Sequence, residues 1–135
     1  MRTAALLCLL AGAVAGCGSA SSDSTKEFKG EEQKVAAAVE QIEKAARDNK
    51  PDTVCTRLFT DTRLTALKAQ GTNCKTGVKE AFKDADSFDV TVDDVTISGN
   101  AATVKVTSGT GSDKKTDTLE LKREGGDWKV DSLAS

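Results

Sequence analysis

The sequence predicts an α+β domain in which N-terminal helices pack on one face of an antiparallel sheet. Between residues 31 and 83 apolar residues recur every three or four positions, which is the period of amphipathic helices. After residue 86 the period shortens to two, which indicates strands with one apolar and one polar face. Strands of that kind belong to an antiparallel sheet covered on one side, and helices followed by such strands make a two-layer domain.

The N-terminus predicts export and lipid attachment. The uncharged stretch 4–16 spans about 20 Å as a helix, which is too short for the ~30 Å core of a bilayer and fits a signal peptide. Val14-Ala15-Gly16-Cys17 resembles the lipobox of bacterial lipoproteins, whose Cys receives a diacylglyceryl group and becomes the mature N-terminus. The resemblance implies that residues 1–16 are removed and that Cys17 is lipidated at the outer side of the cell membrane. An ordinary signal peptide is the alternative.

The polar segment that follows predicts a tether. Residues 17–30 comprise the lipidated Cys and a stretch rich in Gly, Ser and charged residues without an apolar period. A flexible chain of that length reaches about 20 Å. The folded extracytoplasmic domain is therefore predicted to span residues 31–135.

Four helices are predicted in this domain. Glu31–Asn49 is the longest, and its apolar stripe consists of Val35, Ala38, Val39, Ile42 and Ala46. Pro51 starts a short second helix with Val54 and Leu58 facing inward. Thr60 is expected to cap a third helix carrying Leu64 and Leu67, and Asn73 a fourth with Val78, Ala81 and Phe82 on its apolar side.

Cys55 and Cys74 are predicted to form a disulfide. They are the only thiols left in a domain that the signal sends to an oxidising compartment once Cys8 is removed and Cys17 is lipidated. A reactive Cys is the alternative, but the chain has no His to activate it and no Cys-X-X-Cys spacing. The bridge would connect the second helix to the start of the fourth.

Four strands are predicted after the helices. In the first, the alternation of Phe88, Val90 and Val92 slips by one position before Val95 and Ile97, which predicts a bulge at Asp93-Asp94. Turns at Gly99-Asn100 and Gly125-Gly126 and a loop over 108–114 separate the later strands. Their apolar positions are Ala102, Val104, Val106, Leu119, Leu121, Trp128, Val130 and Leu133.

This order of elements resembles the nuclear-transport-factor-two-like superfamily, and more narrowly the small lipoproteins of high-GC Gram-positive bacteria that carry this fold. The residues that carry the likeness are Val35–Ala46, Asp52–Leu58, Cys74–Phe82 and Gly126–Val130. The resemblance covers about residues 31–133 and implies a cone, in which the antiparallel sheet curves around a cavity. The side chains expected to line that cavity are Val104, Val106, Leu119, Leu121, Trp128 and Val130.

Composition removes several classes of function. The chain has no His and no Tyr, which excludes a His-based triad, a His metal site and most acid–base chemistry known in such cones. A net charge of −2 argues against a nucleic-acid binder. Carboxylate-only catalysis stays open, with Asp61, Asp86 or Asp93 as conceivable bases. Asp93-Asp94 and Asp113 lack the Asp-x-Asp-x-Asp-Gly pattern of a calcium loop, so no metal or cofactor is predicted.

The sequence therefore predicts a membrane-anchored extracytoplasmic lipoprotein that acts as a non-catalytic ligand-binding or protein-interaction module. A cavity enzyme that uses carboxylates only, or a purely structural envelope protein, is the alternative. The predicted partners are the membrane through the lipid anchor, a small apolar ligand or another envelope protein, and a second copy of the chain through the sheet.

Overall fold

The computed structural model describes residues 26–85 and 87–134. The predicted signal peptide, the predicted lipidation site Cys17 and Asp86 lie outside the described residues. The elements follow each other as α1 (Gly30–Arg47), α2 (Pro51–Thr53), the π-helical turn η2 (Val54–Leu58), α3 (Asp61–Ala69), α4 (Cys74–Asp84), β1 (Val90–Ser98), β2 (Ala101–Ser108), the 3-10 turn η3 (Gly111–Asp113), β3 (Lys115–Glu124) and β4 (Asp127–Ala134). Helices precede strands, which confirms the predicted α+β order.

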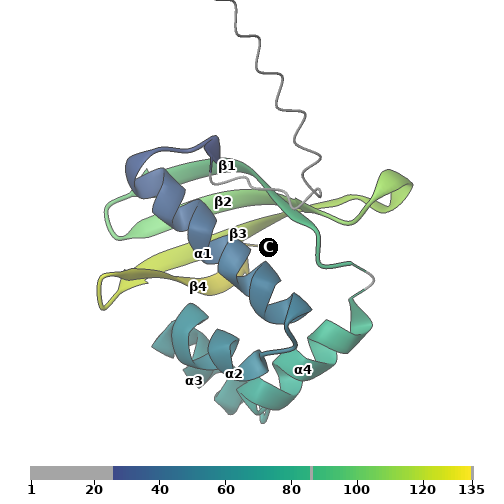
Figure 1. The fold of residues 1–135 in the computed structure, drawn as a ribbon. Helices are drawn as coiled ribbons and strands as arrows, with labels where there is room; N and C mark the ends of the chain where they lie inside the picture. The colour runs from purple at the N-terminus through teal and green to yellow at the C-terminus, as the bar shows by residue number, and fades with distance from the viewer. Residues whose placement is uncertain (1–25, 86, 135) are drawn as a thin grey trace, which may run out of the picture.

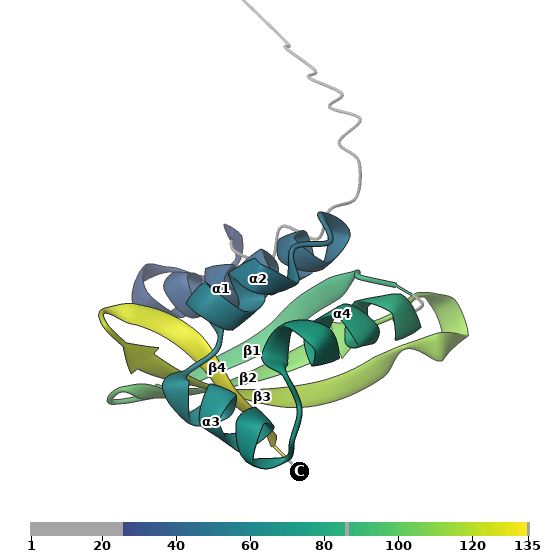
Figure 2. The same cartoon turned by 90° about the horizontal axis from the view of Figure 1, so that it is seen from below.

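The four strands form one antiparallel sheet in the order β1-β2-β3-β4 (Figure 1). The register of β1 shifts between Val92 and Asp94, which confirms the predicted bulge. A second shift lies in β4, where Asp131 is the extra residue opposite the Glu120–Leu121 step of β3. Because bulges bend a strand and increase its twist, these two sites help the sheet to curve, as Figure 2 shows.

A main hydrophobic cluster lies between α1 and the sheet. The stripe of α1 buries Val35, Ala36, Ala38 and Val39 against inward side chains of all four strands, namely Val92, Val95, Ala102, Val104, Val106, Leu121, Trp128 and Val130. Burial of such apolar surface at roughly 25 cal/mol per Å² is what holds a helix on a sheet. The predicted inner faces of α1 and of the strands are therefore confirmed.

A second, smaller cluster holds the short helices. It consists of Ala45 from α1, Val54 and Leu58 from η2, and Val78 from α4. Ile42 and Phe59 are partly buried against both clusters. The chain thus has two neighbouring groups of buried side chains that share these two residues.

The Cys55–Cys74 disulfide joins η2 to the first residue of α4, as predicted, with the Cα atoms 6.0 Å apart. The two predicted helix caps are also present, since Thr60 Oγ1 accepts from Arg63 N and Asn73 Oδ1 accepts from Thr76 N. The helices α3 and α4 bury fewer side chains than the sequence predicts. No residue of α3 is fully buried, and Val78 is the only one in α4.

Three details differ from the sequence prediction. Ala81, expected on the inner face of α4, is exposed. Phe28 lies in the predicted tether, yet it packs against the main cluster, because α1 begins at Gly30 and brings the preceding turn onto the sheet. Phe88 precedes β1, which begins at Val90, and its ring meets that of Phe82 edge to face at 6.0 Å between centroids.

None of the described helices is long and apolar enough to cross a membrane.

Candidate functional site

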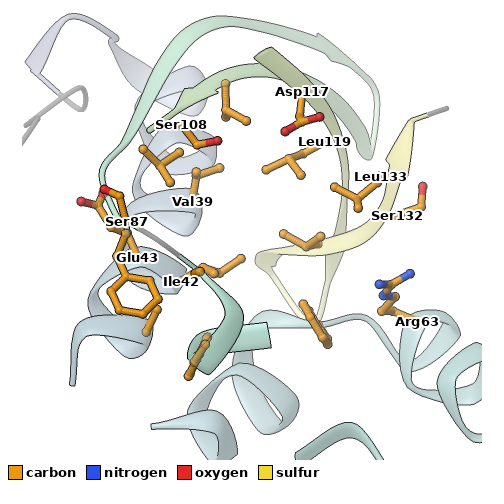
Figure 3. Close-up of a pocket in the computed structure, with 18 residues that line it drawn as sticks. Val39, Ile42, Glu43, Arg63, Ser87, Ser108, Asp117, Leu119, Ser132 and Leu133 are labelled. Carbon is orange, nitrogen blue, oxygen red and sulfur yellow. The ribbon is translucent and has the colours of Figure 1, made fainter. Parts of the chain in front are cut away.

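A cavity of about 340 Å³ lies where the C-terminal half of α1, the start of α3 and the end of α4 face the curved sheet (Figure 3). Twelve of its 18 lining residues are apolar: Val39, Ile42, Ala46, Phe59, Phe82, Ala85, Phe88, Val90, Val106, Leu119, Val130 and Leu133. The six polar residues are Glu43, Arg63, Ser87, Ser108, Asp117 and Ser132. A volume of this size suits a small organic molecule.

Local structure explains why these side chains meet. Ile42 and Ala46 continue the apolar stripe of α1 at helical spacing, so they face the sheet beyond the point where the main cluster ends. Leu119 and Leu133 are paired residues on β3 and β4 and point to the same side. Ala46 and Ala85 are small, which leaves the space between helices and sheet open.

Three of the six residues predicted to line the cavity do so: Val106, Leu119 and Val130. Val104 and Leu121 are instead completely buried in the main cluster under α1, where they leave no open space. The physical reason is that α1 covers the half of the sheet near its own N-terminus. Only the other half remains free to form a cavity.

Trp128 also lies away from the cavity. Its Nε1 donates to Glu31 at 3.1 Å, and the Arg123 guanidinium lies 4.9 Å from its ring centroid. Hydrogen bonds from Lys34 and Trp128 lower the pKa of Glu31. Trp128 therefore connects the start of α1 to the β3–β4 hairpin. It borders a second, more polar hollow of about 510 Å³ that Arg57 also lines.

Glu43 is the buried charge of the cavity wall, with 6% of its surface exposed. Its carboxylate pairs with Arg47 one turn later, and Arg47 also bonds Asp89 at 3.0 Å. Burial raises the pKa of Glu43, and the Arg47 charge opposes part of that rise. A buried carboxyl group with a raised pKa is typical of acid–base sites, but the carboxylate of Glu43 is already paired with Arg47.

Arg63 is the one basic residue among those that line the cavity. Its guanidinium lies over the Phe59 ring, 5.6 Å from the centroid. Its Nε is buried and has no hydrogen-bond partner among the described residues. In Figure 3 Arg63 lies on the opposite side of the cavity from Glu43 and Ser87.

The mouth of the cavity is partly apolar. Asp117 is exposed there, and Leu133 has 61% of its surface exposed, the highest value for a large apolar side chain in the described parts of the chain. The outer face of the sheet, by contrast, exposes polar residues such as Thr103 and Lys105. It offers no apolar patch, within residues 87–134, to the predicted homodimer, which stays a prediction.

Two of the aspartates considered as catalytic bases, Asp61 and Asp93, do not line the cavity. Asp61 is exposed in the first turn of α3, and Asp93 is exposed at the β1 bulge, where it accepts a hydrogen bond from Thr107 at 2.6 Å. Asp94 and Asp113 are also exposed. Across residues 26–85 and 87–134, no group of three or more Cys, Asp or Glu side chains is placed to hold a metal ion.

Sequence reasoning missed the charged residues of the wall, of which Glu43 and Arg63 matter most for the chemistry of the cavity. Glu43 lies one position after Ile42 and four after Val39, so a charge within the apolar stripe of α1 was a usable signal. Arg63 carries no such signal. Its place in the cavity depends on how α3 packs beside β4, which local periodicity does not determine.

Comparison with solved structures identifies the fold. The chain is similar to a de novo designed NTF2 fold protein, NT-9, with a TM-score of 0.52 and 13% sequence identity over 77% of this chain and 86% of the designed one. The fold is thus the NTF2-like α+β cone that the sequence predicted.

Comparison with protein families goes one step further. The family described as "Putative lumazine-binding" matches residues 62–132, which run from the first turn of α3 into β4. The chain belongs to this family. No curated protein matches the chain.

Proposed function

We propose that the protein is a non-catalytic binding protein that holds a small, mostly apolar molecule in its cavity. The observation that carries this proposal is the cavity itself: about 340 Å³, with two thirds of its lining residues apolar. The description of the family, "Putative lumazine-binding", supports the same class of function.

The free-energy cost of leaving such a space unfilled supports a function for the cavity. An empty cavity inside a core costs roughly 24 cal/mol per Å³, so an enclosed void of 340 Å³ would cost about 8 kcal/mol. This cavity is open to solvent and costs less, but larger side chains at Ala46 and Ala85 would fill it. A sequence that keeps the space open is better explained by a ligand than by stability.

Binding is favoured over catalysis by the polar groups of the wall. The carboxylate of Glu43 is paired with Arg47, and Asp117 is exposed at the mouth. An enzymatic alternative would therefore rest on Glu43 and not on Asp61 or Asp93, and it would first have to release Glu43 from its arginine.

The proposal includes attachment to the outer side of the cell membrane through lipid on Cys17. The lipobox-like Val14–Cys17 segment supports it, because a thioether-linked diacylglyceryl group supplies two acyl chains, which anchor a protein stably. Cys17→Ser should move the protein from the membrane fraction to the soluble fraction of producing cells and abolish incorporation of labelled fatty acid. A variant that stays in the membrane fraction would contradict the anchor and leave the cavity proposal untouched.

The cavity can be tested with N-phenyl-1-naphthylamine, a neutral aromatic probe whose fluorescence rises in apolar surroundings. We expect saturable binding by the wild-type protein. Leu119→Trp places a bulky ring in the cavity and should abolish the signal, whereas Thr103→Trp adds the same ring to the outer face of β2 and should leave it intact. Ligands can then be sought among lumazine and other small molecules by thermal shift, since a ligand at 100 times its Kd stabilises by about 2.7 kcal/mol.

Two outcomes of the probe experiment would contradict the proposal. If the probe does not bind, or if both tryptophan variants bind it as the wild type does, the cavity is not a binding site.

A further inference from the structure

We propose that the ligand of the cavity is an amphipathic monoanion, a molecule with an apolar body and one anionic group, and that Arg63 binds the anionic group. This inference rests on the proposed binding function and specifies the charge of the ligand. It makes Arg63 the residue that determines specificity at this site.

The position of Arg63 is fixed by its neighbours. It lies in the first turn of α3, where its backbone N–H donates to the cap residue Thr60 at 3.0 Å. Its guanidinium lies over the ring of Phe59, which also lines the cavity. A cation held against an aromatic ring keeps its donors available in the plane of the guanidinium.

The side-chain donors of Arg63 are not used by the residues that the structure describes. Nε is buried without a hydrogen-bond partner, and Arg63 takes part in no ion pair with the rest of the described chain. The arginines at 47 and 123 do form ion pairs with carboxylates. Because a buried donor without an acceptor is unfavourable, the free guanidinium of Arg63 is better explained as a group that meets its partner in the ligand.

The acidic residues of this region are already engaged or lie elsewhere. Asp131 is attracted electrostatically by Arg63. Its two carboxylate oxygens are already bound, however, since Oδ1 accepts from Thr60 and Oδ2 pairs with Lys122, both at 2.7 Å. Glu43 is paired with Arg47. Asp117 lies at another part of the wall than Arg63, as Figure 3 shows.

The surroundings of Arg63 define the rest of the ligand. A carboxylate can accept two hydrogen bonds from a guanidinium, and such charge-assisted bonds are stronger than neutral ones. The apolar body attached to it would then lie along Leu119 and Leu133 and cover part of the exposed surface of Leu133. At ~30 Å³ for a water-sized group, the cavity holds roughly eleven such groups, which suits a body of about ten carbon atoms.

The test compares three competitors with the same chain and different head groups. Decanoate, 1-decanol and decylamine are titrated near neutral pH against N-phenyl-1-naphthylamine bound to the full protein. We expect decanoate to displace the probe at a concentration about tenfold lower than decanol, and decylamine to be the weakest. Arg63→Gln should remove the advantage of decanoate and leave decanol unchanged, while Arg63→Lys should retain part of it.

Arg57→Gln is the matched control, because Arg57 is an exposed arginine that lines the other hollow. It should leave all three affinities unchanged. Equal displacement by decanoate and decanol from the wild-type protein, or an unchanged preference in Arg63→Gln, overturns this inference while leaving the binding function in place. If Arg63→Gln does not fold, the relative affinities of the three competitors for the wild-type protein decide whether the inference holds. If no probe binds, the proposed function fails and this inference fails with it.

Discussion

Removal of the Cys55–Cys74 disulfide should destabilise the protein by about 3 kcal/mol. The two residues are 19 positions apart, and closing a loop of that length removes about 11 cal/mol/K of entropy from the unfolded chain. In the folded protein few buried contacts can hold these helices in place of the bridge, because α3 has no fully buried residue and α4 has only Val78. The bridge joins η2 to α4 and closes a loop around α3, so it holds the two helices with the fewest buried side chains close to the better-buried η2.

The perturbation is the double substitution Cys55→Ala with Cys74→Ala, measured by urea unfolding. With a denaturant slope of about 1–3 kcal/mol per M, the midpoint should fall by roughly 1–3 M. Native-state hydrogen exchange adds a local readout. Amides of α4 should lose protection in the variant, while those of α1 in the main cluster should keep theirs apart from the global loss.

Wild-type protein treated with a reductant is the matched control, because it keeps both sulfur atoms and lacks only the covalent bond. It should behave like the double variant. A variant that unfolds at the wild-type midpoint, or that keeps full protection in α4, would refute the argument that the bridge holds this helix.

Three further predictions concern single residues. Thr60→Ala should cost about 2 kcal/mol in urea unfolding, because it removes the cap of α3 and the hydrogen bond to Asp131, whereas Thr60→Ser should cost less than ~1 kcal/mol; equal losses would contradict the role of the hydroxyl. Glu43 has a pKa raised by burial above its ordinary value of 4.5, so the folded state holds its proton more tightly than the unfolded chain and stability falls as pH rises through that raised pKa. Glu43→Gln should flatten this part of the stability profile in urea midpoints taken from acidic to neutral pH, and an unchanged slope would argue that Arg47 fully compensates the burial. Val104→Ala should cost about 2–3 kcal/mol, because Val104 is completely buried, yet probe binding should persist, because it does not line the cavity; loss of binding in a folded variant would place Val104 in the site after all.

The elements of the fold could be predicted because each has a local signal. Pro51 marks the start of α2, Thr60 and Asn73 cap α3 and α4, and the parity slip before Val95 marks the β1 bulge. The second bulge, at Asp131, leaves a weaker signal, because Leu133 is the one large apolar residue that follows the change of parity after Val130. A single residue after the slip does not establish a new alternation, whereas Val95 and Ile97 do so in β1.

The cavity could be predicted only in part. Alternation shows that Val104, Val106, Leu119 and Leu121 point inward, but it does not show where along the strands α1 ends and the open space begins. Packing of α1 assigns Val104 and Leu121 to the core and leaves Val106 and Leu119 for the cavity. The presence of Arg63 in the wall depends further on the placement of α3, which has no buried residue that would reveal how it packs.

The two hydrophobic clusters meet at Ile42 and Phe59, and both residues line the cavity. A bound apolar molecule would therefore touch both clusters at once and act as a removable part of the core. Without it, the group around Val54, Leu58 and Val78 shares only these two partly buried residues with the main cluster. With it, the two clusters share one filled interior, so that saturation should stabilise both clusters together and raise the unfolding midpoint of the protein as a whole.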